Sequence, residues 1–80
     1  MARVTLLYFA SLRDAAGTAS ETLDTGVADL AALYAQARER HGFALPVERL
    51  RVAVDGAFAR WTDAVTEGAE VAFIPPVSGG

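Results

Sequence analysis

The last six residues of the sequence carry its clearest chemical signal. They read Pro75-Pro76-Val77-Ser78-Gly79-Gly80. Two prolines hold a chain extended and stiff, and the two glycines add no side chain, so this end is thin and conformationally free. Such an end can enter a narrow channel, and its carboxylate is open to attack or activation. Fraying is the alternative, but a rigid spacer directly before Gly-Gly favours a functional tail.

Composition narrows the chemistry that the chain can perform alone. Its 80 residues suffice for one small domain, with no cysteine and a formal net charge of −3. The missing cysteine excludes thiol nucleophiles, zinc–cysteine sites and iron–sulfur clusters within this chain. The acidic balance argues against a nucleic-acid partner, and the apolar run near the N-terminus is too short to span a membrane. We therefore expect a soluble cytoplasmic domain.

The tail needs a domain to present it, and the apolar pattern predicts an α+β domain with one main helix on a mixed sheet. Five segments have the composition of strands: residues 3–9, 19–24, 50–54, 57–61 and 70–74. Residues 27–41 have the apolar spacing of a helix. This order is that of a ubiquitin-like β-grasp domain, with the most apolar strands, the first and last, adjacent at the centre. We expect the domain over 1–74 and a flexible tail over 75–80.

Signals for turns and helix ends accompany these segments. Asp55-Gly56 favours a tight hairpin turn, and residues 13–18 are predicted to be a turn around Gly17. Thr25 or Gly26 is expected to cap the helix. Its last turn is basic and Gly42 follows, which is typical of a helix C-terminus.

Strand alternation predicts an apolar patch on the sheet face away from the helix. If the alternate residues of the first and last strands face the helix, Phe9 and Ile74 point to the opposite side. Phe58 on the hairpin joins them. Exposed apolar patches on small domains mark partner surfaces, although scattered exposed apolar residues are also common. We predict that these three residues contact a partner.

Other candidate residues have simpler explanations. His41 is expected to interact with the helix dipole rather than to act as a base or ligand. The three acids Asp63, Glu67 and Glu70 flank a turn and are expected to be solvated, so no metal site is predicted. Trp61 is expected to pack at a sheet edge.

Two segments resemble the small subunit of molybdopterin synthase. Residues 6–13, Leu-Leu-Tyr-Phe-Ala-Ser-Leu-Arg, resemble the first strand and turn of that family. Residues 70–80, Glu-Val-Ala-Phe-Ile-Pro-Pro-Val-Ser-Gly-Gly, are similar to its ending almost throughout. Length and element order match as well, so the resemblance covers the whole chain. Asp55 and Ala69 replace the asparagine and aspartate that are common there, which concerns loop geometry rather than the tail.

The resemblance implies a sulfur carrier. An enzyme resembling ubiquitin-activating proteins would use ATP to adenylate the carboxylate of Gly80, which follows Gly79, and a sulfur donor would convert it to a thiocarboxylate. The tail would then enter the large subunit, in a complex of two small and two large subunits. There it would give sulfur to a cyclic pterin phosphate precursor of the molybdenum cofactor. No stably bound cofactor is expected, and the chain would be half of an enzyme rather than catalytic alone.

The resemblance also implies which side chains meet the large subunit. These are Phe9, Arg13, Phe58, Ile74, Pro75, Pro76, Val77 and Ser78. Rival functions stay open: a sulfur carrier for thiamine thiazole or for tRNA thiolation, a ubiquitin-like modifier of lysines, or an inert β-grasp interaction module. The Phe-Ala-x-Leu-Arg turn and the Pro-Pro-Val-Ser-Gly-Gly ending favour the molybdopterin role.

Overall fold

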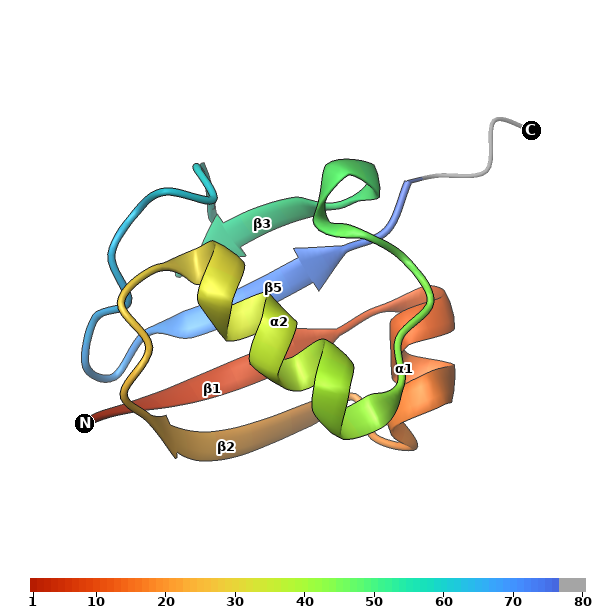
Figure 1. Ribbon diagram of the computed structural model, residues 1–80, viewed down its shortest axis with the longest axis horizontal. Helices are drawn as coiled ribbons and strands as arrows, with labels where there is room; N and C mark the ends of the chain where they lie inside the picture. The colour runs from red at the N-terminus through yellow and green to blue at the C-terminus, as the bar shows by residue number, and fades with distance from the viewer. Residues whose placement is uncertain (77–80) are drawn as a thin grey trace.

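A five-stranded sheet with one long helix across one face forms the core of the computed structural model, which describes residues 1–76 (Figure 1). The strands are β1 (Ala2–Tyr8), β2 (Ser20–Thr25), β3 (Arg51–Val54), β4 (Ala57–Ala59) and β5 (Glu70–Ile74). The helices are α1 (Ala10–Ala16), α2 (Leu30–His41) and the 3₁₀ helix η1 (Val47–Arg49). This is the predicted ubiquitin-like β-grasp fold. No helix within residues 1–76 is both long and apolar enough to span a membrane.

The sheet places the first and last strands side by side at its centre. The order is β2-β1-β5-β3-β4, with β1 parallel to β5 and all other pairs antiparallel. The prediction that the first and last strands are adjacent is confirmed. Because Tyr8 pairs with Phe73, both central strands end at the same edge of the sheet. The turn after β1 and the residues after β5 therefore lie close together.

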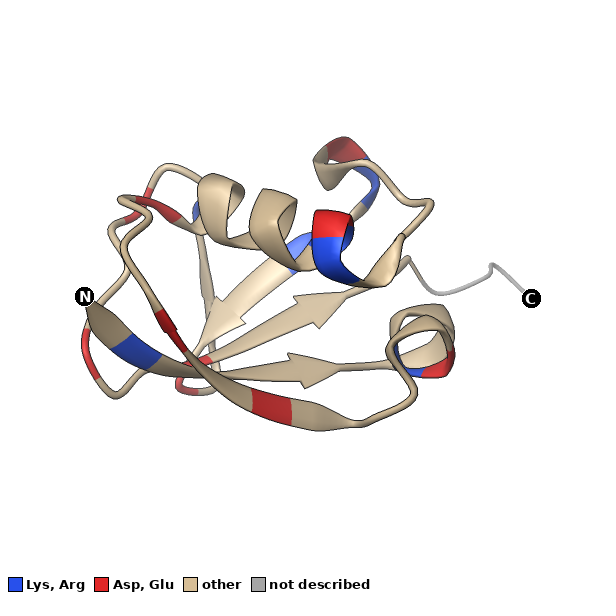
Figure 2. Cartoon of the chain, turned by 60° about the horizontal axis from the view of Figure 1, so that its bottom comes forward, with Lys and Arg blue, Asp and Glu red and all other residues tan. Residues whose placement is uncertain are grey.

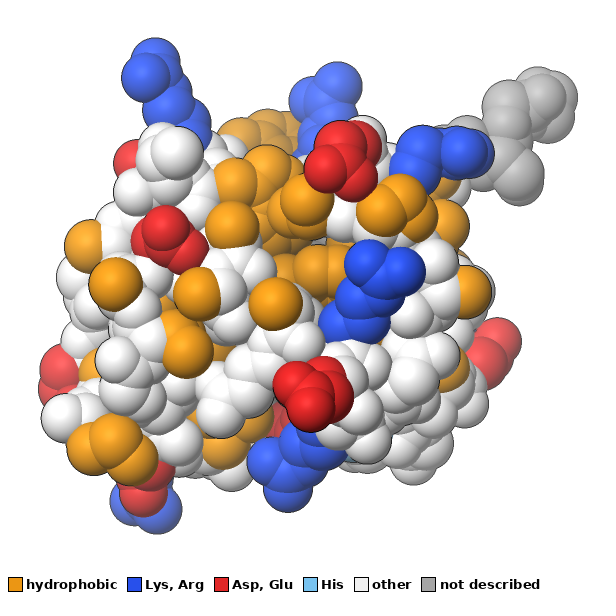
Figure 3. Space-filling model, in the orientation of Figure 1, with side chains coloured by type: hydrophobic (Ala, Val, Ile, Leu, Met, Phe, Trp, Pro, Cys, Tyr) orange, Lys and Arg blue, Asp and Glu red, His pale blue; other side chains and the backbone are white. Residues whose placement is uncertain are grey.

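The core lies between α2 and the central strands. Val4, Leu6 and Tyr8 of β1 and Val71 and Phe73 of β5 are almost fully buried, as the strand alternation predicted. They pack against the buried face of α2, formed by Leu30, Leu33, Tyr34 and Ala37. Figure 3, viewed from the helix side, still shows hydrophobic side chains in a hollow between α2 and β3. The helix therefore covers the inner face of the sheet incompletely.

The expected place of Trp61 is wrong. Strand β4 ends at Ala59, so Trp61 lies beyond it and not in a strand over 57–61. Its ring stacks on Phe73, with 6.1 Å between centroids, and lies 5.9 Å from Tyr34. Trp61 thus extends the aromatic core on the helix side instead of covering a sheet edge.

Helix α1 replaces the turn that was expected over residues 13–18. The chain leaves β1 after Tyr8, Phe9 becomes the extended residue before the helix, and Gly17 ends it with a φ of 76°. Leu12 is the one buried residue that α1 contributes. A seven-residue helix with one apolar anchor has no repeating pattern, which explains why α1 was missed. The placement of Phe9 in the first strand is also wrong.

Helix α2 starts later than predicted. Its N-cap is Asp29, whose Oδ1 accepts a hydrogen bond from the backbone N–H of Ala32 at 2.9 Å. Thr25 and Gly26, the expected caps, lie before the helix, and the buried Thr25 hydroxyl donates to Gln36 Oε1 at 2.7 Å. The predicted C-terminus is confirmed, because Gly42 has a φ of 72° and donates to the carbonyl of Arg38.

The predicted hairpin turn is confirmed between β3 and β4. Asp55 and Gly56 have φ angles of 51° and 88°, the two positive values that a type I′ turn requires. The Asp55 carboxylate also accepts a hydrogen bond from the backbone N–H of Glu70 at 3.0 Å. This bond ties the turn to the start of β5.

A polar network closes the end of the sheet from which the tail leaves. The Tyr8 hydroxyl donates to Glu21 Oε1 at 2.5 Å, and His41 Nε2 lies 2.7 Å from the same oxygen. His41 is thus bonded to a carboxylate on β2 in addition to standing at the end of α2. Burial and then the Glu21 carboxylate raise the pKa of Tyr8 well above its ordinary value, although Arg40 opposes this.

The same network lowers the pKa of Glu21. Burial alone would raise it, but the hydrogen bonds with Tyr8 and His41 and the charges of His41 and Arg40 outweigh that effect. The ionised carboxylate is therefore the form that the folded state favours. It joins β1, β2 and the end of α2.

Replacing the N-cap of α2 tests the corrected helix start. Asp29→Ala removes the hydrogen bond to Ala32 and should lower the free energy of unfolding by about 1 kcal/mol, or the melting temperature by about 5 °C. Asp14→Ala, on the exposed face of α1, is the matched control and should change stability far less. Equal melting temperatures for the two variants would show that Asp29 does not cap the helix.

The Glu21 network predicts an acid-sensitive contribution to stability. A carboxylate whose pKa is lowered by folding stabilises the protein fully above its ordinary pKa of 4.5 and loses that contribution as pH falls through the folded value. Glu21→Gln should therefore be less stable than the parent chain by about 1 kcal/mol at pH 7. The gap should narrow as pH falls below 4.5.

Urea unfolding from pH 7 to pH 3, with Glu39→Gln as the control, measures this gap. Glu39 is an exposed carboxylate of α2. A gap for Glu21→Gln that stays constant over the whole pH range would contradict the network.

Candidate functional site

The root of the tail stands at the end of the central strand. Strand β5 ends at Ile74, followed by the half-buried Pro75 and the exposed Pro76. Neither proline has a backbone N–H to donate, so the hydrogen-bonded ladder stops here. The predicted site residues Val77, Ser78, Gly79 and Gly80 lie outside the described residues.

A patch of apolar side chains covers the sheet face opposite α2. We call it the open-face patch, and its members are Leu7, Phe9, Ala53, Phe58, Ala72 and Ile74. The expected grouping of Phe9, Phe58 and Ile74 is found, since all three line one hollow of about 270 Å³. Phe9 is 46 % exposed and Phe58 69 % exposed. Two phenylalanines this exposed on one face form a surface suited to a protein partner.

Strand register explains the shape of the patch. Phe58 pairs with Ala53, Ala53 with Ala72, and Ala72 with Leu7. This row therefore places two alanines between two large side chains, so the middle of the face is low and its edges are high. Charged side chains are absent from the final four residues of both β1 and β5, whose arrows are tan there in Figure 2. The result is a hollow that is apolar apart from Glu70, with Phe58 at one edge and Leu7 at the other.

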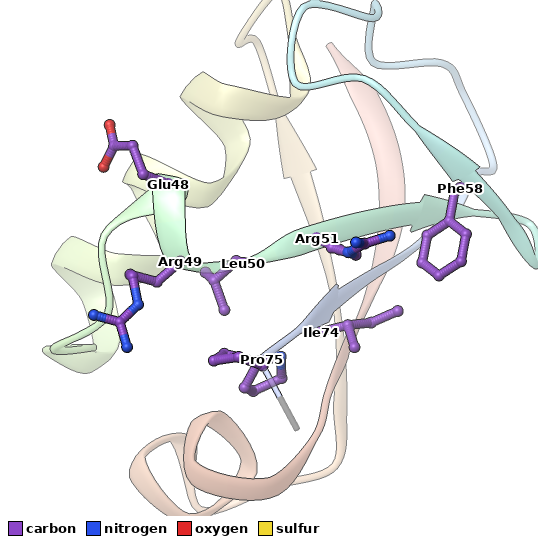
Figure 4. Close-up of a pocket in the computed structure, with 8 residues that line it drawn as sticks. Glu48, Arg49, Leu50, Arg51, Phe58, Ile74 and Pro75 are labelled. Carbon is purple, nitrogen blue, oxygen red and sulfur yellow. The ribbon is translucent and has the colours of Figure 1, made fainter. Parts of the chain in front are cut away.

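A second hollow, of about 500 Å³, lies beside the root of the tail (Figure 4). It is lined by Glu48, Arg49, Leu50, Arg51, Phe58, Ile74, Pro75 and Pro76. Phe58 and Ile74 line both hollows. The open-face patch and the tail root are therefore one continuous surface, and the second hollow adds Glu48, Arg49 and Arg51 to it.

Arg13 is the predicted contact residue that lies apart from these hollows. It belongs to α1, where its backbone N–H donates to the carbonyl of Phe9 at 3.4 Å, and its side chain is exposed. It lines neither hollow. Arg13 therefore stands one helical turn beyond Phe9, beside the open-face patch instead of within it.

Sequence reasoning missed Arg49, Arg51 and the two alanines of the patch floor. Arg51 pairs with Ile74 across β3 and β5, and it therefore shares the outward face with that residue. The alternation that selected Ile74 on β5 would also have selected Arg51 and Ala53 on β3. Arg49 lies in η1, for which the sequence has no periodic signal.

The residues that line the two hollows are of types suited to binding rather than to catalysis. Those of the two hollows include no serine, threonine, histidine or cysteine. Two of the acids that were weighed as a metal site form hydrogen bonds with backbone groups. Asp63 accepts a hydrogen bond from the N–H of Arg60, and Glu67 accepts one from the N–H of Arg3. The site is therefore a largely apolar surface beside the root of the tail, and its lining within residues 1–76 offers no hydroxyl, thiol or imidazole for catalysis.

Comparison with known proteins shows the family. The model of the ThiS family matches residues 6–80. The molybdopterin synthase sulfur carrier subunit of Escherichia coli (strain K12) is 32% identical over 80 residues, which cover 96% of this chain and 99% of that protein. The match to the family model extends through the tail.

Two solved structures share the fold. SAMP1 from Haloferax volcanii, a small archaeal modifier protein, is 26% identical with a TM-score of 0.80, covering 98% of this chain and 99% of that one. A protein–protein complex of subunits 1 and 2 of molybdopterin-converting factor from Helicobacter pylori 26695 contains a chain that is 19% identical, with a TM-score of 0.67 and coverage of 98% and 99%. With the family model and the Escherichia coli relative, these likenesses agree with the resemblance seen in the sequence, and the chain belongs to the ThiS family.

Proposed function

We propose that this chain is the sulfur carrier subunit of a molybdopterin synthase. The observation that carries the proposal is the continuity between the root of a Gly-Gly tail and the exposed open-face patch, since Phe58 and Ile74 line both hollows. One partner can therefore hold the domain by the patch and receive the tail. The Escherichia coli sulfur carrier subunit, similar over almost its full length, supports the same function.

The chemistry starts at the carboxylate of Gly80. A carboxylate is a poor electrophile because its negative charge repels nucleophiles. Attack of its oxygen on the α-phosphorus of ATP, with loss of pyrophosphate, gives an acyl-adenylate whose leaving group is AMP. A sulfur nucleophile from a donor then displaces AMP at the acyl carbon and leaves a thiocarboxylate. The thiocarboxylate sulfur then bonds to a carbon of the cyclic pterin phosphate precursor, and water cleaves the acyl–sulfur bond, which restores the carboxylate of Gly80.

The partners supply the catalytic groups for these steps. The hollows beside the tail root contain apolar side chains, two arginines and two glutamates, and none of these is a nucleophile placed for acyl transfer. Proton transfer and stabilisation of the transition state therefore fall to an adenylating enzyme of the ubiquitin-activating type and to the large subunit. This chain contributes a covalent reagent and stably binds no cofactor.

The large subunit is the partner that we propose for the open-face patch. The related fold in the Helicobacter pylori complex belongs to a protein that assembles with a second subunit. Residues 75–80 reach at most about 20 Å when fully extended, so docking must bring the reacting centre of the large subunit within that distance of Ile74. Arg13, Pro75, Pro76, Val77 and Ser78 contact it in this proposal, in a complex of two small and two large subunits.

A protein modifier is the second candidate, because the fold is shared with SAMP1. In that function the activated Gly80 would be joined to lysines of other proteins. A carrier for thiamine thiazole or for tRNA thiolation would use the same thiocarboxylate with a different acceptor. The product formed at Gly80 thus distinguishes a sulfur carrier from a modifier. Binding of the large subunit distinguishes the molybdopterin carrier from the other sulfur carriers.

Intact mass tests the tail chemistry. After co-expression with its activating enzyme and a sulfur source, the chain should gain the mass difference of one oxygen replaced by sulfur, because a thiocarboxylate has formed. Deletion of Gly80 should abolish the change, and Ala35→Ser, at an exposed position of α2, should preserve it as the control. Higher-mass protein adducts would instead support the modifier, and an unchanged mass would support an inert interaction module.

Two charges in the open-face patch should abolish binding of the large subunit. Phe9→Asp combined with Ile74→Asp removes two anchors of the patch, and affinity should fall by at least about a hundredfold. Isothermal titration measures the affinity, and the melting temperature checks the fold.

The control for this pair is Ala35→Asp with Ala44→Asp, which adds the same charge at exposed positions outside the patch. It should bind like the parent chain. Undiminished binding of the Phe9 and Ile74 variant would remove the patch from the proposed interface.

A further inference from the structure

Arg51 is a charged side chain set directly against the apolar docking face. It stands on β3 opposite Ile74, and its guanidinium carbon lies 5.6 Å from the centre of the Phe58 ring. That is within the range of a cation–π contact. Figure 4 shows Arg51 directed along β3 towards Phe58, whereas Arg49 points away from that ring. Arg51 is therefore held at the joint of the two hollows.

The donors of Arg51 have no partner among the described residues. Within residues 1–76 its guanidinium makes neither an ion pair nor a hydrogen bond, and the ion pairs there are Arg3–Asp24 and Glu21–His41. By contrast, Arg38 donates to the carbonyls of Phe43 and Ala44. Arg38 thus supports the fold, while Arg51 is exposed and available to a partner.

The aromatic contact fixes what Arg51 can recognise. A guanidinium that rests on a ring keeps its edge donors free in a planar fork, which matches the two oxygens of a carboxylate. The aromatic support also limits the freedom of a long side chain, so less entropy is lost when a partner binds. A planar donor fork at the edge of an apolar hollow is therefore preorganised for one anionic group.

We propose that the surface which covers the open-face patch presents an aspartate or glutamate carboxylate to Arg51, and that this pair sets the register of docking. The inference rests on the proposed function and adds the chemistry of the partner to it. Leu50, Phe58, Ile74 and Pro75 form apolar walls around the same hollow, so the carboxylate would be partly shielded from water. Shielding strengthens a charge pair relative to an exposed one.

A protein carboxylate fits this surface better than a nucleic acid does. The chain has a formal net charge of −3 and no lysine, so a polyanion would be repelled by most of the molecule. A single carboxylate inside an apolar contact needs one well-placed cation. Arg51 supplies it, and Glu48 on the far side of the hollow disfavours a second acidic group.

Binding of the large subunit from the same organism tests the inference. Arg51→Gln keeps a long polar side chain but removes the charge, and it should weaken binding about tenfold. The affinity of the Arg51→Gln variant should also fall less steeply with rising salt concentration than the affinity of the parent chain does. The control is Arg3→Gln, which makes the same change in net charge near the start of β1, at the end of the sheet away from the tail. It should alter affinity less than about twofold.

A double-variant cycle connects the effect to the aromatic contact. Phe58→Leu keeps the patch apolar but removes the ring beneath Arg51. The loss caused by Arg51→Gln should therefore be smaller in the Phe58→Leu background than in the parent chain. Melting temperatures of all variants identify any that have lost the fold.

The possible results separate the two claims. If the parent chain binds the large subunit and Arg51→Gln weakens binding no more than Arg3→Gln, the carboxylate partner is wrong while the proposed function survives. If the parent chain itself fails to bind the large subunit, the proposed function fails and the inference with it. An additive cycle would show that Phe58 does not prepare Arg51 for its partner.

Discussion

The parallel pairing of β1 and β5 is the constraint on which the rest of the molecule depends. Parallel central strands have apolar residues on both faces, and in most proteins both faces are covered. Here α2 covers one face, where Leu6, Tyr8, Val71 and Phe73 are buried. The other face carries Leu7 and the rest of the open-face patch, and no helix of residues 1–76 lies across it (Figures 1 and 2). A partner bound to that face would shield the second side of the central strands from water.

The same pairing determines where the tail begins. Because β1 and β5 run in one direction, the turn with Phe9 and the chain beyond Ile74 lie at one edge of the sheet. The Tyr8–Glu21–His41 network holds this edge together on the helix side. In the proposed function this geometry couples docking to delivery, because a surface that binds the open-face patch also lies next to the root of the tail at Pro75.

Much of this arrangement could be predicted from the sequence because it depends on local periodicity. Alternation in two strands placed Phe9 and Ile74 on the outer face, and Asp55-Gly56 predicted a turn that needs two positive φ angles. Helix α1 and the cap at Asp29 could not be predicted in the same way. One rests on a single buried leucine, and the other depends on where tertiary packing lets the helix begin. The Arg51–Phe58 contact joins two strands and became visible only with their register.

The absence of cysteine limits where this chain could carry sulfur. The chain has no cysteine, so it cannot carry sulfur as a persulfide, and the proposed function attaches the sulfur atom to the carboxyl group of Gly80 instead. The most direct test combines the thiocarboxylated chain, the large subunit and the cyclic pterin phosphate precursor in a single-turnover assay. The account predicts formation of the dithiolene with loss of two thiocarboxylates for each dithiolene, because each chain carries one sulfur atom. Intact thiocarboxylate beside unchanged precursor, in a complex that has assembled, would contradict it.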